Sequence, residues 1–366
     1  MRTMQAMDRP GPAPDRASPA RSRLPLALLA TVGALLLAEG LVRWLHLGPG
    51  VYGLATRWFR LSALPGVEYE FRPLVPYGRE FINADSMRDR PRQVEKAPGV
   101  YRVACVGDSI CVGLGISATQ CFSRVWENAL QEEGVAAEVL NFGVPGYNLR
   151  HILAALRART MKYRPDMVVY AYCLNDVQED SFELEELKDR LSPAQRDFWE
   201  RSKQRGASWL ARSRLYNLAR YGLAARFGRP GPPRHTRPED DPQFVAIFGG
   251  RAGPYFQSLY DDAGRARLRT GLQEFGNSVR EEGALPVLAV FPLPDRIAGS
   301  ALDPVYELVV SAAREADLRV VDLRGDFAQN GINRLFGDPL HPNAPGHEVA
   351  AGALARELDV FVRGGR

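Results

Sequence analysis

The segment YRVACVGDS at residues 101–109 joins an apolar run to a glycine and two polar side chains. The apolar part, 101–106, has the length and composition of a buried β-strand. Apolar residues then recur at helical spacing over 122–130, and Gly134 follows as a stop signal. The sequence therefore predicts a strand and a crossover helix at the start of a domain.

The same unit repeats along the rest of the chain. Apolar runs predict further strands at 137–142, 166–173, 285–291 and 318–323, and helical spacing predicts helices at 149–156, at 263–282 and after Pro345. Such alternation is typical of an α/β fold with a central parallel sheet covered on both faces. Ligands bind beyond the carboxyl ends of the strands in these sheets, so reactive residues are expected there.

The charge distribution argues against a nucleic-acid partner, and the spacing of the cysteines argues against a metal site. The net charge is +4, and five Arg against two Asp place +3 of it in residues 1–23, which leaves about +1 for the rest. No nucleic-acid partner is expected, because phosphate binding needs a basic face. The four cysteines lack zinc-type spacing, so no metal site is expected. Cys105 and Cys173 are predicted to be buried thiols in strands, and pairing of Cys111 with Cys121 stays open.

The amino terminus predicts a membrane anchor. Residues 1–23 are rich in Pro, Ala and Arg and are expected to form a disordered cytoplasmic tail. The segment 24–45 is apolar apart from Glu39 and Arg43, which can pair on one helix face, and is interpreted as an uncleaved transmembrane signal anchor; cleavage stays open. The alternative is a buried helix of the soluble domain. With the Arg-rich side in the cytoplasm, the rest of the chain would be extracytoplasmic, either periplasmic or extracellular.

Polar residues follow the predicted strands in one order. They are Gly107-Asp108-Ser109, Gly143, Asn175-Asp176 and, ahead of the last helix, Asp338-Pro-Leu-His341. A serine hydroxyl becomes a nucleophile when an imidazole takes its proton and a carboxylate holds that imidazole. Ser109, His341 and Asp338 are therefore the candidate catalytic triad. The candidate oxyanion-hole donors are the backbone N–H groups of Ser109 and Gly143 and the side-chain amide of Asn175.

Each block taken alone has a simpler interpretation. Gly107 and Gly143 fit ordinary turns, Ser109 fits a helix cap, and Asn175-Asp176 fits a turn. His347, in the last predicted helix, is expected to be a solvent-facing or capping residue without a catalytic role. The common placement of the blocks at predicted strand ends favours one site.

The four blocks resemble the conserved blocks of the GDSL/SGNH hydrolases over about residues 100–360. The resemblance implies a three-layer, flavodoxin-like SGNH hydrolase fold and a serine esterase that requires no metal or organic cofactor. It also implies that the four residues that give the family its name are Ser109, Gly143, Asn175 and His341. Asp338 is then the acid of the triad. The blocks depart from the usual pattern at Cys173, where glycine is common, and at Ile110, where leucine is common.

Two segments lie outside these blocks. Residues 46–99 form an amino-proximal linker or edge segment, in which 66–95 resembles a stretch ahead of the hydrolase domain in some bacterial members and is expected to add strands to the domain edge. The hydrolase domain, 100–366, carries an insertion at 178–262. The composition is helical over 182–227 and rich in Pro and Gly over 228–242, which is expected to be loose. The insertion is either a lid or substrate wall at the site or a helical decoration packed away from it.

Three functions are compatible with the sequence. The first is a serine esterase or acylhydrolase that removes an acyl group, acetyl among the candidates, from a carbohydrate or lipid ester. The second is an O-acyltransferase acting on a cell-surface glycan, in which a sugar hydroxyl replaces water at the same triad. The third is a non-catalytic glycan-binding domain.

Overall fold

The computed structural model describes residues 24–45, 55–203, 213–221, 245–246, 249–294 and 299–364. The predicted disordered tail, 1–23, and the predicted loose segment, 228–242, lie outside these residues. The elements named below all belong to the described part of the chain.

The core of the domain is a five-stranded sheet. Its strands are β5 (Tyr101–Gly107), β6 (Ala137–Asn141), β7 (Met167–Tyr172), β8 (Leu285–Val290) and β9 (Arg319–Asp322). They run parallel in the order β6-β5-β7-β8-β9. The sequence prediction of five parallel strands is confirmed, with ends that differ by at most one residue. Continuous apolar runs serve these strands because both faces of the sheet are covered.

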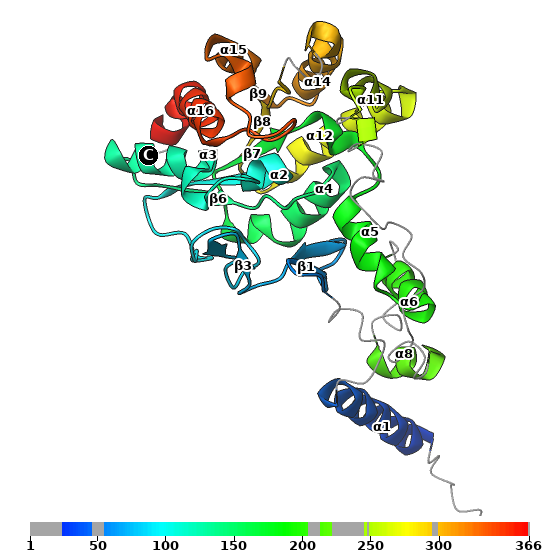
Figure 1. Cartoon of the computed structure of the whole chain (residues 1–366). Coiled ribbons are helices and arrows are strands. Elements are labelled where there is room, and N and C mark those ends of the chain that lie inside the picture. The colour runs from blue at the N-terminus through cyan, green and yellow to red at the C-terminus, as the bar shows by residue number, and fades with distance from the viewer. Residues whose placement is uncertain are drawn as a thin grey trace, which may run out of the picture.

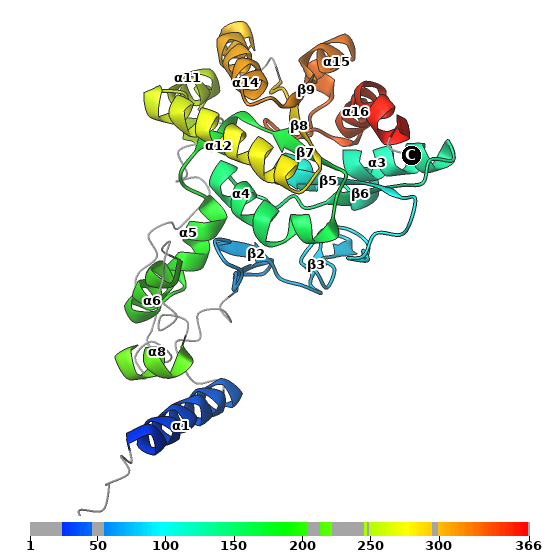
Figure 2. The same cartoon turned by 180° about the vertical axis from the view of Figure 1, so that it is seen from behind.

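Helices cover both faces of the sheet (Figures 1 and 2). On one side α3 (Phe122–Glu132) packs against α16 (Ala344–Gly364), and on the other α12 (Asp262–Glu281) contacts both α4 (Leu149–Ala158) and α14 (Asp303–Glu315). This division follows from right-handed crossovers that run in opposite directions from β5. The predicted α/β fold with three layers, of the SGNH hydrolase type, is therefore confirmed.

The amino-proximal segment contributes strands, as expected, and these form two hairpins apart from the central sheet. β1 (Phe59–Leu61) pairs only with β2 (Tyr69–Phe71), and β3 (Pro76–Tyr77) pairs only with β4 (Glu80–Phe81). The reason is aromatic packing: Phe59 stacks on Phe71 at 5.2 Å, and Tyr69 meets Tyr147 of the loop after β6 edge-on at 5.1 Å. The hairpins cover a loop and a helix instead of a strand edge.

The insertion is helical where it is described. It contains α5 (Phe182–Asp189), α6 (Pro193–Lys203), α8 (Arg214–Tyr221) and α11 (Ala252–Ser258). α5 contacts β1, so the insertion begins beside the amino-proximal hairpins. The remaining short elements are α2 (Ser109–Val112), α15 (Arg324–Gln329) and 3-10 turns at Ala118–Gln120, Thr160–Tyr163, Leu174–Val177, Gly299–Leu302 and Ile332–Arg334.

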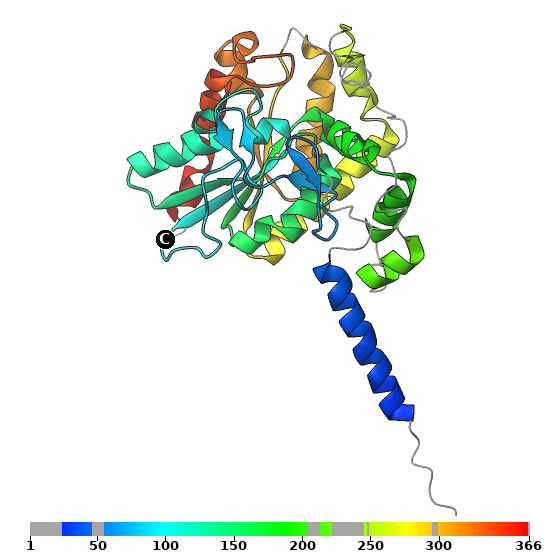
Figure 3. The same ribbon diagram turned by 60° about the horizontal axis from the view of Figure 1, so that its bottom comes forward.

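An apolar helix, α1 (Leu24–Trp44), projects away from the domain (Figures 1 and 3). Its window Ala27–Trp44 is long and apolar enough to cross a membrane, and only 6% of it is buried. The alternative, a helix buried in the core of the soluble domain, is therefore not what the structure shows. Arg43 Nε donates to Glu39 at 2.7 Å, as the spacing predicted, and Glu39 also accepts from Ser213 Oγ and from the backbone N–H of Leu215 in α8.

All four cysteines are free and buried. Both Cys105 and Cys173 are buried, as predicted; Cys105 lies in β5, whereas Cys173 follows the last residue of β7. Cys121 Sγ donates to the carbonyl oxygen of Cys111 at 3.3 Å, so these two residues are neighbours that carry thiols in this structure.

Candidate active site

Ser109 lies two residues after the end of strand β5, where it begins α2. Gly107 allows this turn, because a Cβ there would lie 2.8 Å from the carbonyl oxygen of Ala171 on β7. Asp108 caps α2, since its Oδ1 accepts the N–H of Ile110 at 2.8 Å. The hydroxyl of Ser109 is thus held at the carboxyl edge of the sheet, where the sequence predicted reactive residues.

Three side chains form a hydrogen-bonded chain at this edge. His341 Nε2 lies 3.0 Å from Ser109 Oγ, and His341 Nδ1 lies 2.8 Å from Asp338 Oδ2. Asp338 Oδ1 accepts the backbone N–H groups of Leu340 and His341, both at 2.8 Å. The structure therefore brings together Ser109, His341 and Asp338 in the geometry that a serine nucleophile needs.

The carboxylate of Asp338 stays ionised over the physiological pH range. Partial burial raises the pKa of Asp338, but the hydrogen bond and charge of His341 and two backbone N–H groups outweigh it and bring the pKa to about 2. The Asp338 side chain is 49% exposed and the His341 side chain 17% exposed. Water therefore has access to the acid end of the hydrogen-bonded chain.

The Gly143 loop packs directly against α2. A Cβ on Gly143 would lie 2.4 Å from the backbone nitrogen of Val112, so only glycine fits. The N–H of Gly143 donates to Asn141 Oδ1 at 2.9 Å. Asn141 Nδ2 in turn donates to the carbonyl oxygen of Cys111 at 2.9 Å, which ties the loop to α2. The expected oxyanion donor Gly143 is therefore beside Ser109, with its N–H bound to a neighbouring side chain.

Asn175 reaches the same edge from the turn after β7. Its Nδ2 lies 3.4 Å from Asp108 Oδ2. The turn is closed by Asp176, whose Oδ2 accepts from Tyr170 Oη at 2.9 Å and from the backbone N–H of Cys173 at 3.0 Å. Burial, then the charge of Asp108, raises the pKa of Asp176 well above its usual range, and burial also raises the pKa of Asp108. Both carboxyls are thus shifted toward the neutral form.

Three supporting residues were not identified from the sequence. Asn141 locks the Gly143 loop, Tyr69 Oη donates to the carbonyl oxygen of Pro145 in that loop at 2.8 Å, and Tyr260 Oη donates to the carbonyl oxygen of Leu174 at 3.0 Å. Only Asn141 carried a signal, as a polar residue at the end of an apolar strand. Tyr69 lies in the amino-proximal hairpin, and Tyr260 lies at the end of the insertion, just before α12.

His347 is not solvent-facing, so that alternative is wrong. It is fully buried, its ring stacks on Phe122 at 5.9 Å, and its Nδ1 accepts the N–H of Phe122 at 3.2 Å. The ring therefore caps the first turn of α3 from the neighbouring helix α16. Burial, with the charges of His341 and Arg88, lowers the pKa of His347 to about 3, so the ring is neutral.

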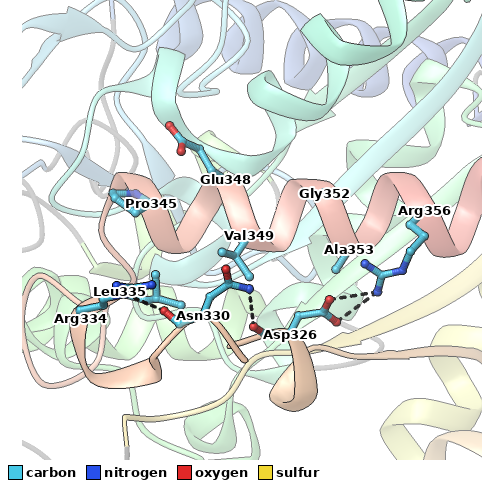
Figure 4. A pocket seen from close by; sticks show the side chains of 10 residues that line it. All are labelled: Asp326, Asn330, Arg334, Leu335, Pro345, Glu348, Val349, Gly352, Ala353 and Arg356. Carbon is cyan, nitrogen blue, oxygen red and sulfur yellow. Dashed lines mark hydrogen bonds and ion pairs between the residues drawn. The ribbon is translucent and has the colours of Figure 1, made fainter. Parts of the chain in front are cut away.

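Within the described part of the chain, the hydrogen-bonded residues Ser109, His341 and Asp338 belong neither to a metal-binding cluster nor to the surface groove between α15 and α16. No cluster of three His, Cys, Asp or Glu that could hold a metal occurs among the described residues. A groove of about 660 Å³ lies between α15 and α16 (Figure 4), where Arg356 pairs with Asp326 at 3.0 Å. Its lining includes none of Ser109, Asp338 and His341.

The model of the GDSL-like lipase/acylhydrolase family matches residues 105–349, which is more than half of the 366 residues. This chain belongs to that family. As a GDSL-like hydrolase it is an enzyme that hydrolyses ester bonds. The matched range includes every block of the candidate site. No curated protein matches the chain at a significant level.

Three solved structures with low identity to this GDSL-like hydrolase are similar to it over most of their own length. The structure of TesA is 15% identical and covers 70% of this chain and 98% of its own, with a TM-score of 0.41. The lipase/acylhydrolase of Enterococcus faecalis is 14% identical, with 71% and 96% covered and a TM-score of 0.42. A catalytic mutant of an acetylxylan esterase from Geobacillus stearothermophilus is 16% identical, with 70% and 94% covered and a TM-score of 0.42.

The two departures from the usual family pattern are both buried. Ile110 is 1% exposed and Cys173 is 3% exposed. At Ile110 an apolar side chain of similar volume fills the core, so the change keeps the packing. Neither position supplies a group of the hydrogen-bonded chain.

Proposed function

We propose that this GDSL-like hydrolase is a serine esterase that works through an acyl-enzyme on Ser109. The observation that carries the proposal is the hydrogen-bonded chain from Ser109 Oγ through His341 to Asp338. His341 is the general base, and Asp338 holds its Nδ1 proton and stabilises the imidazolium. Ser109 Oγ would reach an ester carbonyl placed at the carboxyl edge of the sheet, with Asp338 on the far side of the imidazole.

The reaction has two steps that share one oxyanion site. Ser109 Oγ attacks the ester carbonyl carbon while His341 Nε2 takes the hydroxyl proton and then gives it to the leaving alcohol. Water, deprotonated by His341, next attacks the acyl-enzyme and releases the acid together with free Ser109. The N–H groups of Ser109 and Gly143 and the Asn175 amide stabilise the oxyanion; loss of one such donor typically costs about 100- to 1000-fold in rate.

The Gly143 donor has an acceptor in the free enzyme. Its N–H donates to Asn141 Oδ1 at 2.9 Å. A full negative charge is a stronger acceptor than a neutral amide oxygen. When the tetrahedral intermediate forms, the Gly143 N–H therefore donates its hydrogen bond to the oxyanion, either in addition to Asn141 Oδ1 or in place of it. Asn141 thus orients this N–H before substrate arrives.

The substrate we propose is an acyl ester, acetyl among the candidates, of a carbohydrate or a lipid. The family assignment supports acyl-ester chemistry. We prefer hydrolysis to the alternative of O-acyl transfer to a cell-surface glycan because the matching family is one of lipases and acylhydrolases. A non-catalytic glycan-binding domain is disfavoured by the intact hydrogen-bonded chain.

We also propose that α1 is a membrane anchor and that the catalytic domain is extracytoplasmic. Leu37 is 77% exposed, and the leucines along α1 need an apolar environment such as lipid. A signal sequence has the same composition, so cleavage is tested directly by amino-terminal sequencing of the mature protein. The insertion at 178–262 is proposed as a wall of the site, because it begins at Gln178, whose backbone N–H donates to the carbonyl oxygen of Asn175 at 2.9 Å.

The test is turnover of a p-nitrophenyl ester series of increasing acyl length by the full chain in detergent. Ser109→Ala and His341→Ala are expected to abolish turnover, and a fluorophosphonate probe is expected to label the wild type but not Ser109→Ala. Ser258→Ala, an exposed serine at the end of α11, is the matched control and should keep both properties. A wild type that is neither active nor labelled at Ser109 overturns the proposal; labelling without turnover supports the transferase.

A further inference from the structure

Arg88, in the segment ahead of the hydrolase domain, lies behind the nucleophile helix α2. Its side chain is 4% exposed. Nη1 donates to the carbonyl oxygens of Val112 at 3.0 Å and Gly113 at 2.5 Å, and Nη2 donates to the carbonyl oxygen of Ile116 and to Glu80 Oε2 at 3.0 Å. One buried guanidinium therefore binds three carbonyl groups of the turn that follows α2.

That turn folds back onto Ser109. The backbone N–H of Leu114 donates to the carbonyl oxygen of Ser109 at 2.9 Å, and the N–H of Gly113 donates to the carbonyl oxygen of Ile110 at 3.1 Å. Gly113 and Gly115 have φ angles of 73° and 88°, a left-handed conformation that reverses the chain here. The peptide groups that bind the backbone of Ser109 are thus the ones that Arg88 holds.

The position of α2 also sets the geometry of the oxyanion donors. The Cα of Gly143 packs so closely on the Cys111–Val112 peptide that a Cβ would lie 2.4 Å from Val112 N. Any displacement of Val112 therefore changes the separation between the N–H groups of Ser109 and Gly143. Both Val112, through its carbonyl oxygen, and the turn after it are fixed by Arg88.

Arg88 is itself presented by a rigid loop. Asn83 Oδ1 accepts the backbone N–H groups of Asp85 and Met87 at 2.9 and 3.0 Å, and Asn83 Nδ2 donates to the carbonyl oxygen of Arg90 at 3.1 Å. The guanidinium of Arg88 also lies over the ring of Tyr77, 5.1 Å from its centroid. The loop and the hairpin β3-β4 together leave the guanidinium one orientation, toward α2.

We propose that Arg88 is a positioning residue for the reaction at Ser109. It rests on the proposed function and deepens it: the amino-proximal segment is part of the catalytic apparatus because it fixes α2 and hence the hydroxyl and oxyanion donors. A guanidinium suits the task because its planar fork reaches several carbonyl oxygens at once, whereas a lysine ammonium is a single point charge.

The test compares two arginines that are equally buried. Arg102 is 1% exposed and donates to the carbonyl oxygens of Val94 and Tyr163, at the end of β5 away from Ser109. The full chain carrying Arg88→Lys, Arg88→Ala or Arg102→Lys is assayed for Tm, kcat, KM and the rate of fluorophosphonate labelling. The labelling rate reports on nucleophile geometry without a contribution from product release.

The expected result is a split between stability and catalysis. Arg88→Lys should lower kcat and the labelling rate by about 10- to 100-fold with KM changed less than about twofold, as misplacement by about 1 Å predicts. Arg102→Lys should lower Tm to a similar extent with kcat within about twofold of wild type. Millimolar methylguanidinium should restore part of the kcat of Arg88→Ala. Glu80→Gln keeps Arg88 but loosens it, and should lower kcat less than Arg88→Lys does.

Several outcomes overturn the inference. It fails if both Arg88 variants keep kcat and labelling rate within about twofold of wild type, or if Arg102→Lys loses as much kcat as Arg88→Lys at the same loss of Tm. If Arg88→Ala does not fold, an unchanged kcat in both Arg88→Lys and Glu80→Gln overturns it. A wild type that is not labelled at Ser109 removes the proposed function as well, whereas a reactive wild type with unaffected variants removes the role of Arg88 alone.

Discussion

Replacing Gly143 by alanine should separate catalysis from binding. The added Cβ would lie 2.4 Å from the nitrogen of Val112 and 2.8 Å from the carbonyl carbon of Cys111. Neither atom is the end of a flexible side chain, so the Gly143 loop and α2 must move apart by about 1 Å to reach ordinary contact. Such a shift moves one oxyanion donor away from Ser109, and about 100-fold in kcat is expected to be lost, or about 2.7 kcal/mol of transition-state stabilisation.

The assay is steady-state hydrolysis of a short-chain p-nitrophenyl ester together with thermal unfolding. KM should change little because the donor acts on the oxyanion of the transition state, and overpacking should cost about 1–3 kcal/mol of unfolding free energy. Gly352→Ala in α16 is the matched control: a Cβ there meets nothing within 4 Å, so kcat should be unchanged and stability equal or higher. A kcat for Gly143→Ala within about twofold of wild type would refute the reasoning.

Three further substitutions test other parts of the site. Asp338→Asn should lower kcat by about 1000-fold or more. In the wild type the ionised carboxylate adds stability that is present above about pH 4 and is lost as pH falls toward the folded pKa of about 2; pH-dependent unfolding of Asp338→Asn should lack this contribution. The buried ring of His347 is neutral in the folded state but is protonated in the unfolded state, so the wild type should lose about 1.4 kcal/mol of stability per pH unit as pH falls from about 6.5 to about 3. His347→Phe should lack this pH dependence; identical pH profiles for the two proteins would contradict the prediction. Tyr260→Phe removes the donor to the carbonyl oxygen of Leu174 and should lower kcat about three- to tenfold by loosening the Asn175 turn, which an unchanged kcat would disprove.

The central sheet was predictable because each of its strands is a continuous apolar run. The predicted strand 285–291 and the observed β8, Leu285–Val290, differ by one residue. The candidate site was predictable for a related reason: its blocks follow strand ends, and parallel topology brings strand ends together. The predicted strand ends, together with the family resemblance, therefore predicted that Ser109, Gly143 and Asn175 lie at one edge of the sheet.

The supporting contacts were not predictable because they join segments far apart in the chain. Tyr69 binds the carbonyl of Pro145 across 76 positions, and Phe122 binds His347 across 225. Strands of two or three residues have too little periodicity to indicate a partner, so the pairings of β1 with β2 and of β3 with β4 were not predicted. A histidine in an amphipathic helix likewise gives no sign of which face it occupies until the neighbouring helix is placed.

The four free thiols all lie buried in the hydrophobic core of the catalytic domain. Cys105 lies in β5, Cys111 lies in α2, and Cys121 and Cys173 lie against the same core. Burial raises the pKa of each of the four thiols, so electrophiles meet almost no thiolate in the native protein. The rate at which maleimide modifies these cysteines in the wild-type protein therefore measures how often the sheet around Ser109 opens transiently, and no engineered cysteine is needed.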